Sequence, residues 1–561
     1  MKICIIKEGG YKDMKKTGRV KRSMALLLAL SLVLCLLMAG CAGKPPEESP
    51  GAPDTPSAPG ASQNVDTPSG PKQGGVLRYA SGNGIVSPGY TPECTNNASL
   101  LFLTTAYESL VTYAEDGSTV GLLATGWEID ADEPSITWTL RENVKFADGE
   151  PFNAEAVKRN IEEYQSKERT ETAVITSMEV IDDTHIKMVL DNWSSSAVES
   201  IGFFVYYMSP KALEDVDALR TSSCGTGPFQ VSEFNPGVSI KYTKNTGYWQ
   251  QGKPYLDGVE IYVVEQQTTL SSAFQAGEYD MIMLADMTIA SDLMAMGSTA
   301  SGTIVNETNT NGQGLTICGL IPNSADPSSP FADARVRRAM ALAVDAGAIC
   351  DAFGYGVYTP TDQWATPEAI TYNTGITPLG YDPDKARALL AEAGYPDGFN
   401  TTLTVSPYVS DYFTAAAAML DEVGIHCELN MVDNATEVSM YSTGSWEGIM
   451  GHYATISPDL GLYMGRHLDY NGTFYAAGIQ HPEDHMELLE KIRASSDEKE
   501  KLDYEWQLQA LIYDKETGSA LFGKPLLVIK NMYYKYDYLK DDGRAVCEAN
   551  IWSIADAWMD K

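Results

Sequence analysis

The chain has 561 residues, and its 75 acidic and 40 basic residues give a formal net charge of −35. This acidic balance argues against nucleic-acid partners, which require a basic surface. Hydrophobic residues make up 44% of the chain and charged residues 20%, which is ordinary for a globular protein. The negative charge favours solubility outside the cell, and a preference for cationic ligands is the alternative explanation.

The N-terminal segment has the pattern of an export signal. Residues 24–40 form an uncharged run, "MALLLALSLVLCLLMAG", directly after the basic stretch 19–22. A basic segment, a short apolar segment and small residues are typical of a secretory signal. A transmembrane helix needs about 20 apolar residues, so the run is slightly short for one. We predict a signal peptide over residues 1–40, with an uncleaved anchor as the alternative. Translation starts at Met1 or Met14.

The stretch "LMAGC" (37–41) resembles the bacterial lipobox, with Met38 where leucine is more usual. This resemblance implies that the Cys41 thiol takes a diacylglyceryl group and that Cys41 becomes the mature N-terminus. A signal that merely ends near a cysteine is the alternative. A lipid anchor would then be the only contact of the chain with a membrane.

Residues 42–74 are rich in Pro, Ser and Gly and carry few large apolar side chains, so they cannot bury a core. We predict a tether here, about 30 Å long if coiled and about 100 Å if polyproline-like. A tether of this length lifts the rest of the chain off a membrane and favours a Gram-positive type of envelope.

The body, residues 75–561, is too long for one core and is expected to form at least two lobes. Residues 136–140 and 238–243 alternate in polarity as half-buried strands do. Helices are predicted after Asn153 and after Asp382, which are both good N-cap residues. Gly424 is expected to end a helix before another strand. Strand and helix signals alternate, so the fold class is α/β.

Six cysteines are scattered through the body, without a CxxC pair, and their spacing gives no disulfide pattern. His481 and His485 are four residues apart, but no third ligand is evident nearby. We therefore expect neither a metal site nor a cofactor.

Six stretches of the body together resemble one family, the extracellular solute-binding proteins of the dipeptide, oligopeptide and nickel type, which deliver ligands to ABC importers. Each stretch is weak evidence alone, but all six occur in family order. They are "GGVLRYA" (74–80), residues 107–130, "ITWTLRENVKFADGEPFNAEAVKRNIE" (136–162), residues 225–261, "PFADARVRRAMALAVD" (330–345) and "DPDKARALLAEAGYPDGF" (382–399).

The resemblance implies a two-lobed fold like that of type II periplasmic binding proteins, with mixed sheets and a hinged cleft between the lobes. It places lobe 1 at residues 75–315 and 525–561, and lobe 2 at residues 316–524. The segments that cross between the lobes should lie near 316–323 and 523–530. The expected protein is a monomer that is not an enzyme, and its partners are a small solute and ABC permease subunits.

The resemblance also implies that three regions face the cleft. The predicted ligand-binding residues are Tyr90, Asn96, Asn97, Trp193, His452, Tyr453, Thr455 and Asp459.

One of these regions departs from the family pattern. Peptide-binding members resemble W-x-A-D-Y, in which the aspartate holds the ammonium group of the peptide. In this chain His452 stands in place of the tryptophan and Thr455 in place of the aspartate, unless Asp459 substitutes after a register shift. A hydroxyl recovers only part of the attraction between two charges. The expected solute is therefore peptide-like, a glycoside or a chelate.

Two other function classes remain as alternatives. A lipid-anchored ligand sensor fits the same fold, since fold does not dictate function. A secreted hydrolase is less favoured, because the sequence has no GxSxG nucleophile motif.

Overall fold

The computed structural model describes residues 70–82, 87–94, 102–114, 118–308, 315–456, 459–468, 475–515, 520–543, 552 and 554–561. The predicted signal peptide, Cys41, the tether up to residue 69, Asn96 and Asn97 lie outside the described residues. Ser69–Lys561 form one compact unit. Within the described ranges, no helix is both long enough and apolar enough to cross a membrane.

The first sheet has eight strands in the order β12-β13-β20-β11-β1-β10-β9-β8. Its central strand β1 pairs in parallel with β10 and β11, and the remaining pairs are antiparallel. In chain order its strands are β1 (Val76–Ser81), β8 (Phe229–Asn235), β9 (Ser239–Lys244), β10 (Gly258–Val263), β11 (Met281–Leu284), β12 (Ser298–Thr299), β13 (Gly302–Thr308) and β20 (Met532–Tyr536).

A four-stranded antiparallel sheet, in the order β4-β5-β7-β6, is inserted between β1 and β8 in the chain. Its strands are β4 (Ala124–Asp130), β5 (Ser135–Leu140), β6 (Ile175–Asp182) and β7 (His185–Leu190). Two small two-stranded sheets lie outside the larger ones. One pairs β2 (Val111–Tyr113) with β3 (Thr119–Gly121), and the other pairs β21 (Leu539–Lys540) with β22 (Trp558–Met559).

The third sheet has six strands in the order β15-β19-β14-β18-β16-β17. Strands β16, β17 and β18 run parallel to one another, and β14 is antiparallel to both β18 and β19. The strands are β14 (Thr316–Pro322), β15 (Thr359–Pro360), β16 (Phe399–Val405), β17 (Ile425–Met431), β18 (Ile449–Thr455) and β19 (Lys524–Ile529).

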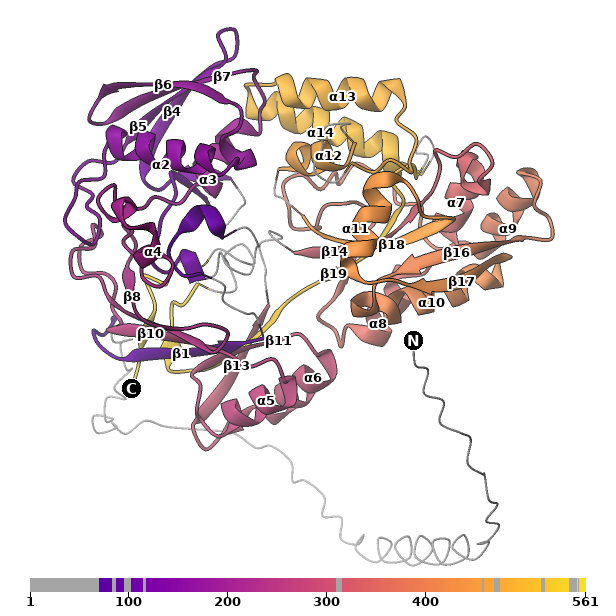
Figure 1. Cartoon of the computed structure of the whole chain (residues 1–561). Helices are drawn as coiled ribbons and strands as arrows, with labels where there is room; N and C mark the ends of the chain where they lie inside the picture. The colour runs from indigo at the N-terminus through magenta and orange to yellow at the C-terminus, as the bar shows by residue number, and fades with distance from the viewer. Residues whose placement is uncertain are drawn as a thin grey trace, which may run out of the picture. The chain divides into compact units, whose positions relative to one another are not determined.

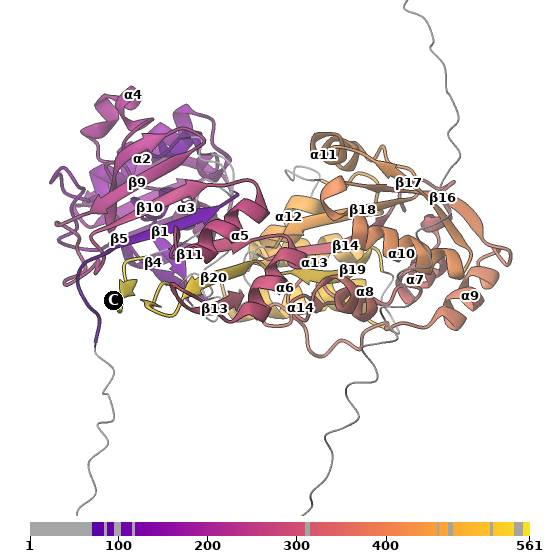
Figure 2. The ribbon, with the colours of Figure 1, turned by 90° about the horizontal axis from the view of Figure 1, so that it is seen from below.

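The helices cover these sheets, and Figures 1 and 2 show α10 along the parallel strands of the six-stranded sheet. The α-helices are α2 (Ala154–Ser166), α3 (Ala197–Phe204), α4 (Val216–Leu219), α5 (Gln267–Gln275), α6 (Met287–Met296), α7 (Ala334–Leu342), α8 (Ala346–Phe353), α9 (Pro383–Glu392), α10 (Ser410–Glu422), α11 (Asn434–Thr443), α12 (Leu460–Leu468), α13 (Glu483–Ala494) and α14 (Glu498–Tyr513). Short 3-10 turns are η1 (Thr91–Glu93), η2 (Thr170–Thr172), η3 (Ala212–Glu214), η4 (Pro330–Ala332) and η5 (Pro407–Val409).

The predicted local signals are confirmed where they can be checked. The side chain of Asn153 accepts a hydrogen bond from the backbone N–H of Ala156 at 3.0 Å, and that of Asp382 from Lys385 at 2.9 Å. These caps satisfy amides that the first helical turn leaves unpaired. Gly424 has a φ of +98° between α10 and β17, a conformation that glycine adopts without the strain of a side chain.

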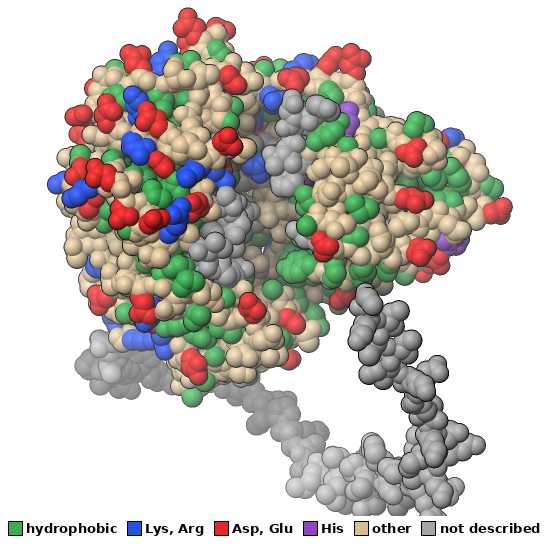
Figure 3. Space-filling view, in the orientation of Figure 1, with side chains coloured by type: hydrophobic (Ala, Val, Ile, Leu, Met, Phe, Trp, Pro, Cys, Tyr) green, Lys and Arg blue, Asp and Glu red, His purple; other side chains and the backbone are tan. Residues whose placement is uncertain are grey.

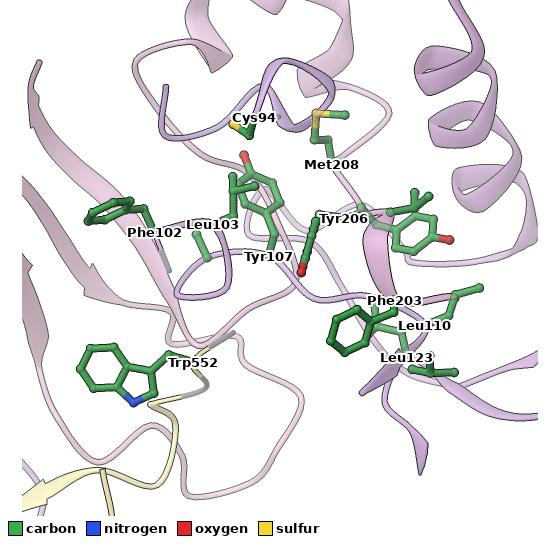
Figure 4. Close-up of a cluster of buried hydrophobic side chains, with 14 of the residues drawn as sticks. Cys94, Phe102, Leu103, Tyr107, Leu110, Leu123, Phe203, Tyr206, Met208 and Trp552 are labelled. Carbon is green, nitrogen blue, oxygen red and sulfur yellow. The ribbon is translucent and has the colours of Figure 1, made fainter. Parts of the chain in front are cut away.

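The first hydrophobic core joins distant parts of the chain. Figure 4 shows Phe102, Tyr107, Phe203 and Trp552 among its side chains, and all four are essentially inaccessible to water. The Thr104 hydroxyl also donates a hydrogen bond to the Trp552 carbonyl at 3.2 Å. Trp552, near the C-terminus, is thus part of the same core as Phe102, Tyr107 and Phe203.

In the order of the described strands, the chain passes twice between the eight-stranded and six-stranded sheets. The first passage lies between β13 and β14, and the second lies between β19 and β20. Pro525–Ile529 therefore pair within the six-stranded sheet, and Met532–Tyr536 within the eight-stranded one. The lobe boundaries at 315/316 and 524/525 stay a prediction.

On the face that Figure 3 shows, acidic and basic side chains lie close together on the left part of the molecule, whereas the right part shows scattered acidic side chains and few basic ones.

Candidate functional site

The carboxyl ends of the parallel strands β16, β17 and β18 meet at one edge of the six-stranded sheet. Open α/β sheets bind ligands at such edges. Tyr408 follows β16 and is 67% exposed, and Met431 ends β17 and is 53% exposed. Tyr453 and Thr455 lie at the end of β18, and the Tyr408 and Tyr453 ring centres are 5.8 Å apart. We call these four residues the strand-end surface.

Strand geometry divides the predicted residues of β18 between the two faces of the sheet. His452 lies opposite Gly319 and contacts the aromatic cluster around Trp364, whereas Tyr453 lies opposite Cys318 and packs on the core of the other face. Successive side chains of a strand point to opposite faces, so this division follows from the sequence register. The structure brings Tyr453 to the exposed edge with Thr455 and places His452 behind it.

His452 is held in a buried aromatic cluster. Its ring is stacked on Tyr441 at 4.7 Å with an angle of 9° between the planes, and Tyr441 stacks in turn on Trp446 at 5.7 Å. Trp364 and His467 lie 5.9 and 5.7 Å from the His452 ring centre. This packing fixes the orientation of the imidazole.

Glu437, in the first turn of α11, is the acidic neighbour of this cluster. Its side chain is 4% exposed, and its Oε1 lies 3.7 Å from Nδ1 of His452. This distance is too long for a hydrogen bond. Oε2 of Glu437 and both ring nitrogens of His452 are buried without a hydrogen-bond partner within the described part of the chain.

Asp459 already carries a charged partner. Its Oδ2 accepts a hydrogen bond from Nζ of Lys501 at 2.5 Å, and both side chains are largely buried. Burial lowers the pKa of Lys501, but the charges of Asp459 and Glu505 outweigh that effect and hold the pKa above its usual value. The lysine thus offsets the negative charge with which Asp459 would hold a ligand ammonium.

Trp193 belongs to a segment that contacts the end of α13. Its indole N–H donates to the Ser495 carbonyl at 3.3 Å. The backbone N–H of Ser195 donates to the Arg493 carbonyl, and the Ser195 hydroxyl donates to the Ile492 carbonyl, both at 2.8 Å. The last carbonyls of a helix lack partners within it, so these donors cap α13 from a distant segment.

Tyr90 lies in the first core and has no exposed surface. Its hydroxyl donates to Oε1 of Glu163 at 2.5 Å, and the cations of Lys167 and Arg220 lie 5.5 and 5.7 Å from its ring centre. Burial and the hydrogen bond to Glu163 raise the pKa of Tyr90. These contacts give Tyr90 a packing role in the first core, and a ligand contact of Tyr90 stays a prediction.

Sequence reasoning missed two residues of this region. Tyr408 comes soon after β16 and directly after Pro407. An aromatic residue at the end of a strand is a feature of the sequence that could have pointed to this site. Glu437 gave no such signal, because its approach to His452 depends on how α11 packs. Among the described residues, no group of three or more His, Cys, Asp or Glu side chains is placed to hold a metal ion.

Comparison with known proteins adds the family. Residues 118–474 match the model of the bacterial extracellular solute-binding proteins, family 5. The glutathione-binding protein GsiB of Salmonella typhi is 31% identical over 349 residues, which cover 58% of this chain and 64% of that protein. The heme-binding protein A of Haemophilus influenzae is 28% identical over 333 residues, or 54% of this chain and 59% of that protein. The matches therefore span slightly less than two thirds of these relatives.

Solved structures agree in fold. NikA from Brucella suis, in complex with Fe(III)-EDTA, superposes with a TM-score of 0.73 at 21% identity, over 85% of this chain and 98% of NikA. DppA from Helicobacter pylori, in complex with the peptide STSA, gives a TM-score of 0.67 at 22% identity, over 87% and 99% of the two chains. The predicted α/β fold with mixed sheets is confirmed. Together with the match over residues 118–474, this shows that the chain belongs to family 5 of the bacterial extracellular solute-binding proteins.

Proposed function

We propose that this chain is the membrane-tethered substrate-binding protein of an ABC importer. It captures a small solute between two lobes and delivers that solute to permease subunits. The family match over residues 118–474 is the observation that carries the proposal. A family of solute-binding proteins also favours a binding role over an enzymatic one.

Two lobes are the proposed basis of capture. The eight-stranded and four-stranded sheets would belong to lobe 1 and the six-stranded sheet to lobe 2, with the two passages of the chain between sheets acting as hinges. A cleft joined by a few crossing segments closes by small changes in those segments. The contacts of Trp193 and Ser195 with the end of α13 would then help to hold the closed form.

The solute is proposed to be peptide-like, a glycoside or a chelate. Relatives are named for glutathione and heme, and related structures hold a tetrapeptide and Fe(III)-EDTA, so the family fold accepts several chemistries. Thr455 supplies no charge, and Asp459 is paired with Lys501. The free α-amine of an ordinary peptide therefore lacks its expected carboxylate at the end of β18.

Anchoring through Cys41 can be tested separately. Replacing the thiol by Cys41→Ser removes the atom that would be acylated, so we expect the protein to leave the lipoprotein fraction with its fold intact. Cell fractionation and intact-mass measurement check this. Membrane-bound native protein that still begins at Met1 or Met14 would contradict lipidation.

Uptake by living cells tests the transport role. Deleting the gene should abolish accumulation of the radiolabelled solute that the purified protein binds, and the native gene should restore it. Unchanged uptake together with a lost transcriptional response to the solute would instead identify a sensor.

A further inference from the structure

Tyr408 presents an aromatic ring to solvent at the carboxyl end of β16. Among the large hydrophobic residues of the described ranges it has the largest exposed fraction, 67%. It lies in η5, the short turn that joins β16 to α10. The turn is fixed on both sides of the ring, because Ser406 and Val409 are buried and the Val409 N–H donates to the Ser406 carbonyl at 3.2 Å. An exposed ring is thus held in place at a strand end, where open α/β folds bind ligands.

Tyr453 supplies a second ring beside the first. The two ring centres are 5.8 Å apart and the planes are inclined at 43°, so neither ring is stacked flat on the other. Tyr453 is half-buried and packs on the core of the sheet, which fixes its orientation. Burial raises the pKa of Tyr408 although most of the residue is exposed. A side chain that lines a recess combines crowded surroundings with open surface in this way, so a solute can reach this ring.

The elements that form this edge of the sheet supply no basic side chain. Residues 399–455, which contain β16, α10, β17, α11 and β18, have no Lys or Arg. A carboxylate or an anionic chelate would therefore find no lysine or arginine on these elements. The ammonium group of a peptide also lacks its expected acid, because Thr455 is uncharged and Asp459 is paired with Lys501. These observations favour a neutral solute.

Two exposed acids close to the strand ends have their charges stabilised by helix N-termini. The carboxylate of Asp433 caps α11 and accepts hydrogen bonds from the backbone N–H of Thr436 at 3.0 Å and from the Thr436 hydroxyl at 2.9 Å. Asp411 lies in the first turn of α10. Neither acid therefore requires a cationic solute.

The strand-end surface itself combines hydroxyl groups with apolar area. Tyr408, Tyr453 and Thr455 each carry a hydroxyl, which donates and accepts hydrogen bonds without a charge. Met431, which is 53% exposed, adds apolar surface. Ligand sites typically combine aromatic and apolar walls with a few polar groups of this kind.

We propose that the strand-end surface binds a neutral sugar ring of the solute, with Tyr408 packed against the apolar face of that ring. A pyranose ring whose hydroxyls are equatorial has C–H groups on both faces and hydroxyls around its edge. The faces match the tyrosine rings, and the edge matches the protein hydroxyls. The proposal rests on the solute-binding function above and narrows it to glycosides and oligosaccharides.

Calorimetric titration with methyl β-cellobioside, whose ring hydroxyls are all equatorial, tests the proposal. We expect saturable binding to the native protein and at least tenfold weaker binding of sorbitol, an open-chain polyol without a rigid ring face. Tyr408→Ala should weaken binding of the cellobioside about fivefold or more, whereas Tyr408→Phe and Tyr408→Trp keep an aromatic face and should retain most of the affinity. The matched control is Tyr381→Ala, which removes a tyrosine that is 45% exposed before α9 and should change the affinity less than twofold.

The outcomes separate this proposal from the function on which it rests. No saturable binding of the cellobioside, equal binding of sorbitol, or an unchanged affinity in Tyr408→Ala would each overturn the proposal. An equal loss in Tyr408→Phe and Tyr408→Ala would overturn the packing of the sugar on the ring. Tight binding of a peptide or a chelate in the same experiments would still support solute capture. If Tyr408→Ala does not fold, the comparison of the two probes on the native protein decides alone.

Discussion

Glu108 is a fully enclosed carboxyl group in the first core. It accepts hydrogen bonds from the Thr226 hydroxyl at 2.8 Å, the Tyr248 hydroxyl at 2.9 Å and the Trp249 indole at 2.9 Å. Burial raises its pKa to about 7, and these hydrogen bonds limit the rise. The folded protein therefore binds a proton more tightly than the unfolded chain, in which the group has its ordinary pKa near 4.5.

This difference predicts a pH dependence of stability. Between about pH 4.5 and pH 7 the folded state holds the extra proton, so the free energy of unfolding contributed by Glu108 falls as the pH rises. Glu108→Gln removes this pH-dependent contribution. From pH 5 to pH 7.5, the free energy of unfolding of Glu108→Gln should therefore rise by about 1–3 kcal/mol relative to that of the native protein. Urea unfolding of both proteins at the two pH values measures this difference. If the free energy of unfolding has the same pH dependence in both proteins, folding does not raise the pKa of Glu108 and the prediction is wrong.

Thr455 allows a test of selectivity at one residue. It is exposed at the end of β18 and pairs with Thr316, so an aspartate there meets little steric cost. Thr455→Asp should raise the affinity for short peptides with a free α-amine by about 1–3 kcal/mol, the range of a charge-assisted hydrogen bond. Asn430→Asp adds the same charge at an exposed site and should not do so. Sub-micromolar binding of unmodified di- to pentapeptides by native protein would contradict the prediction.

At the scale of elements, the end of α13 depends on a segment roughly 300 residues earlier in the chain. Ser195→Ala removes the hydroxyl that donates to the Ile492 carbonyl. One such bond contributes about 1 kcal/mol, so hydrogen exchange at residues 490–496 should become about fivefold faster. Ser196→Ala is the control, since that hydroxyl contacts the Ser194 hydroxyl instead. Equal exchange in native protein and Ser195→Ala would show that the contact does not stabilise α13.

Local elements of this chain could be predicted because their signals are short-range. Asn153 and Asp382 cap helices through amides three residues away, and the alternation of residues 136–140 gives β5. The site could be predicted only in part. Glu437 contacts His452, and Lys501 contacts Asp459, across different helices, strands and loops. Such contacts depend on tertiary packing, so the spacing of residues in the sequence does not predict them. The family pattern located β18 but did not show that His452 and Tyr453 lie on opposite faces.

At the scale of the whole molecule, the three sheets and their connections fit the proposal that two lobes close around a solute. Among the described strands, the chain passes between the eight-stranded and six-stranded sheets at two places, before β14 and after β19. Few connections allow large relative motion at low cost, since only the residues of the hinges change conformation. The described body cysteines, Cys94, Cys224, Cys318, Cys350 and Cys427, are not disulfide-bonded and so do not restrict it.

Thermal unfolding of the purified protein in the presence of candidate solutes tests the central claim most directly. The panel should contain short peptides, glycosides, diamines and metal chelates. A solute that binds the folded state, present at 100 times its Kd, adds about 2.7 kcal/mol to the free energy of unfolding. We predict that at least one class of solute binds the folded state and therefore raises the Tm to a saturating value. A folded protein whose Tm responds to none of these classes at millimolar concentration would contradict the claim that it captures a small solute.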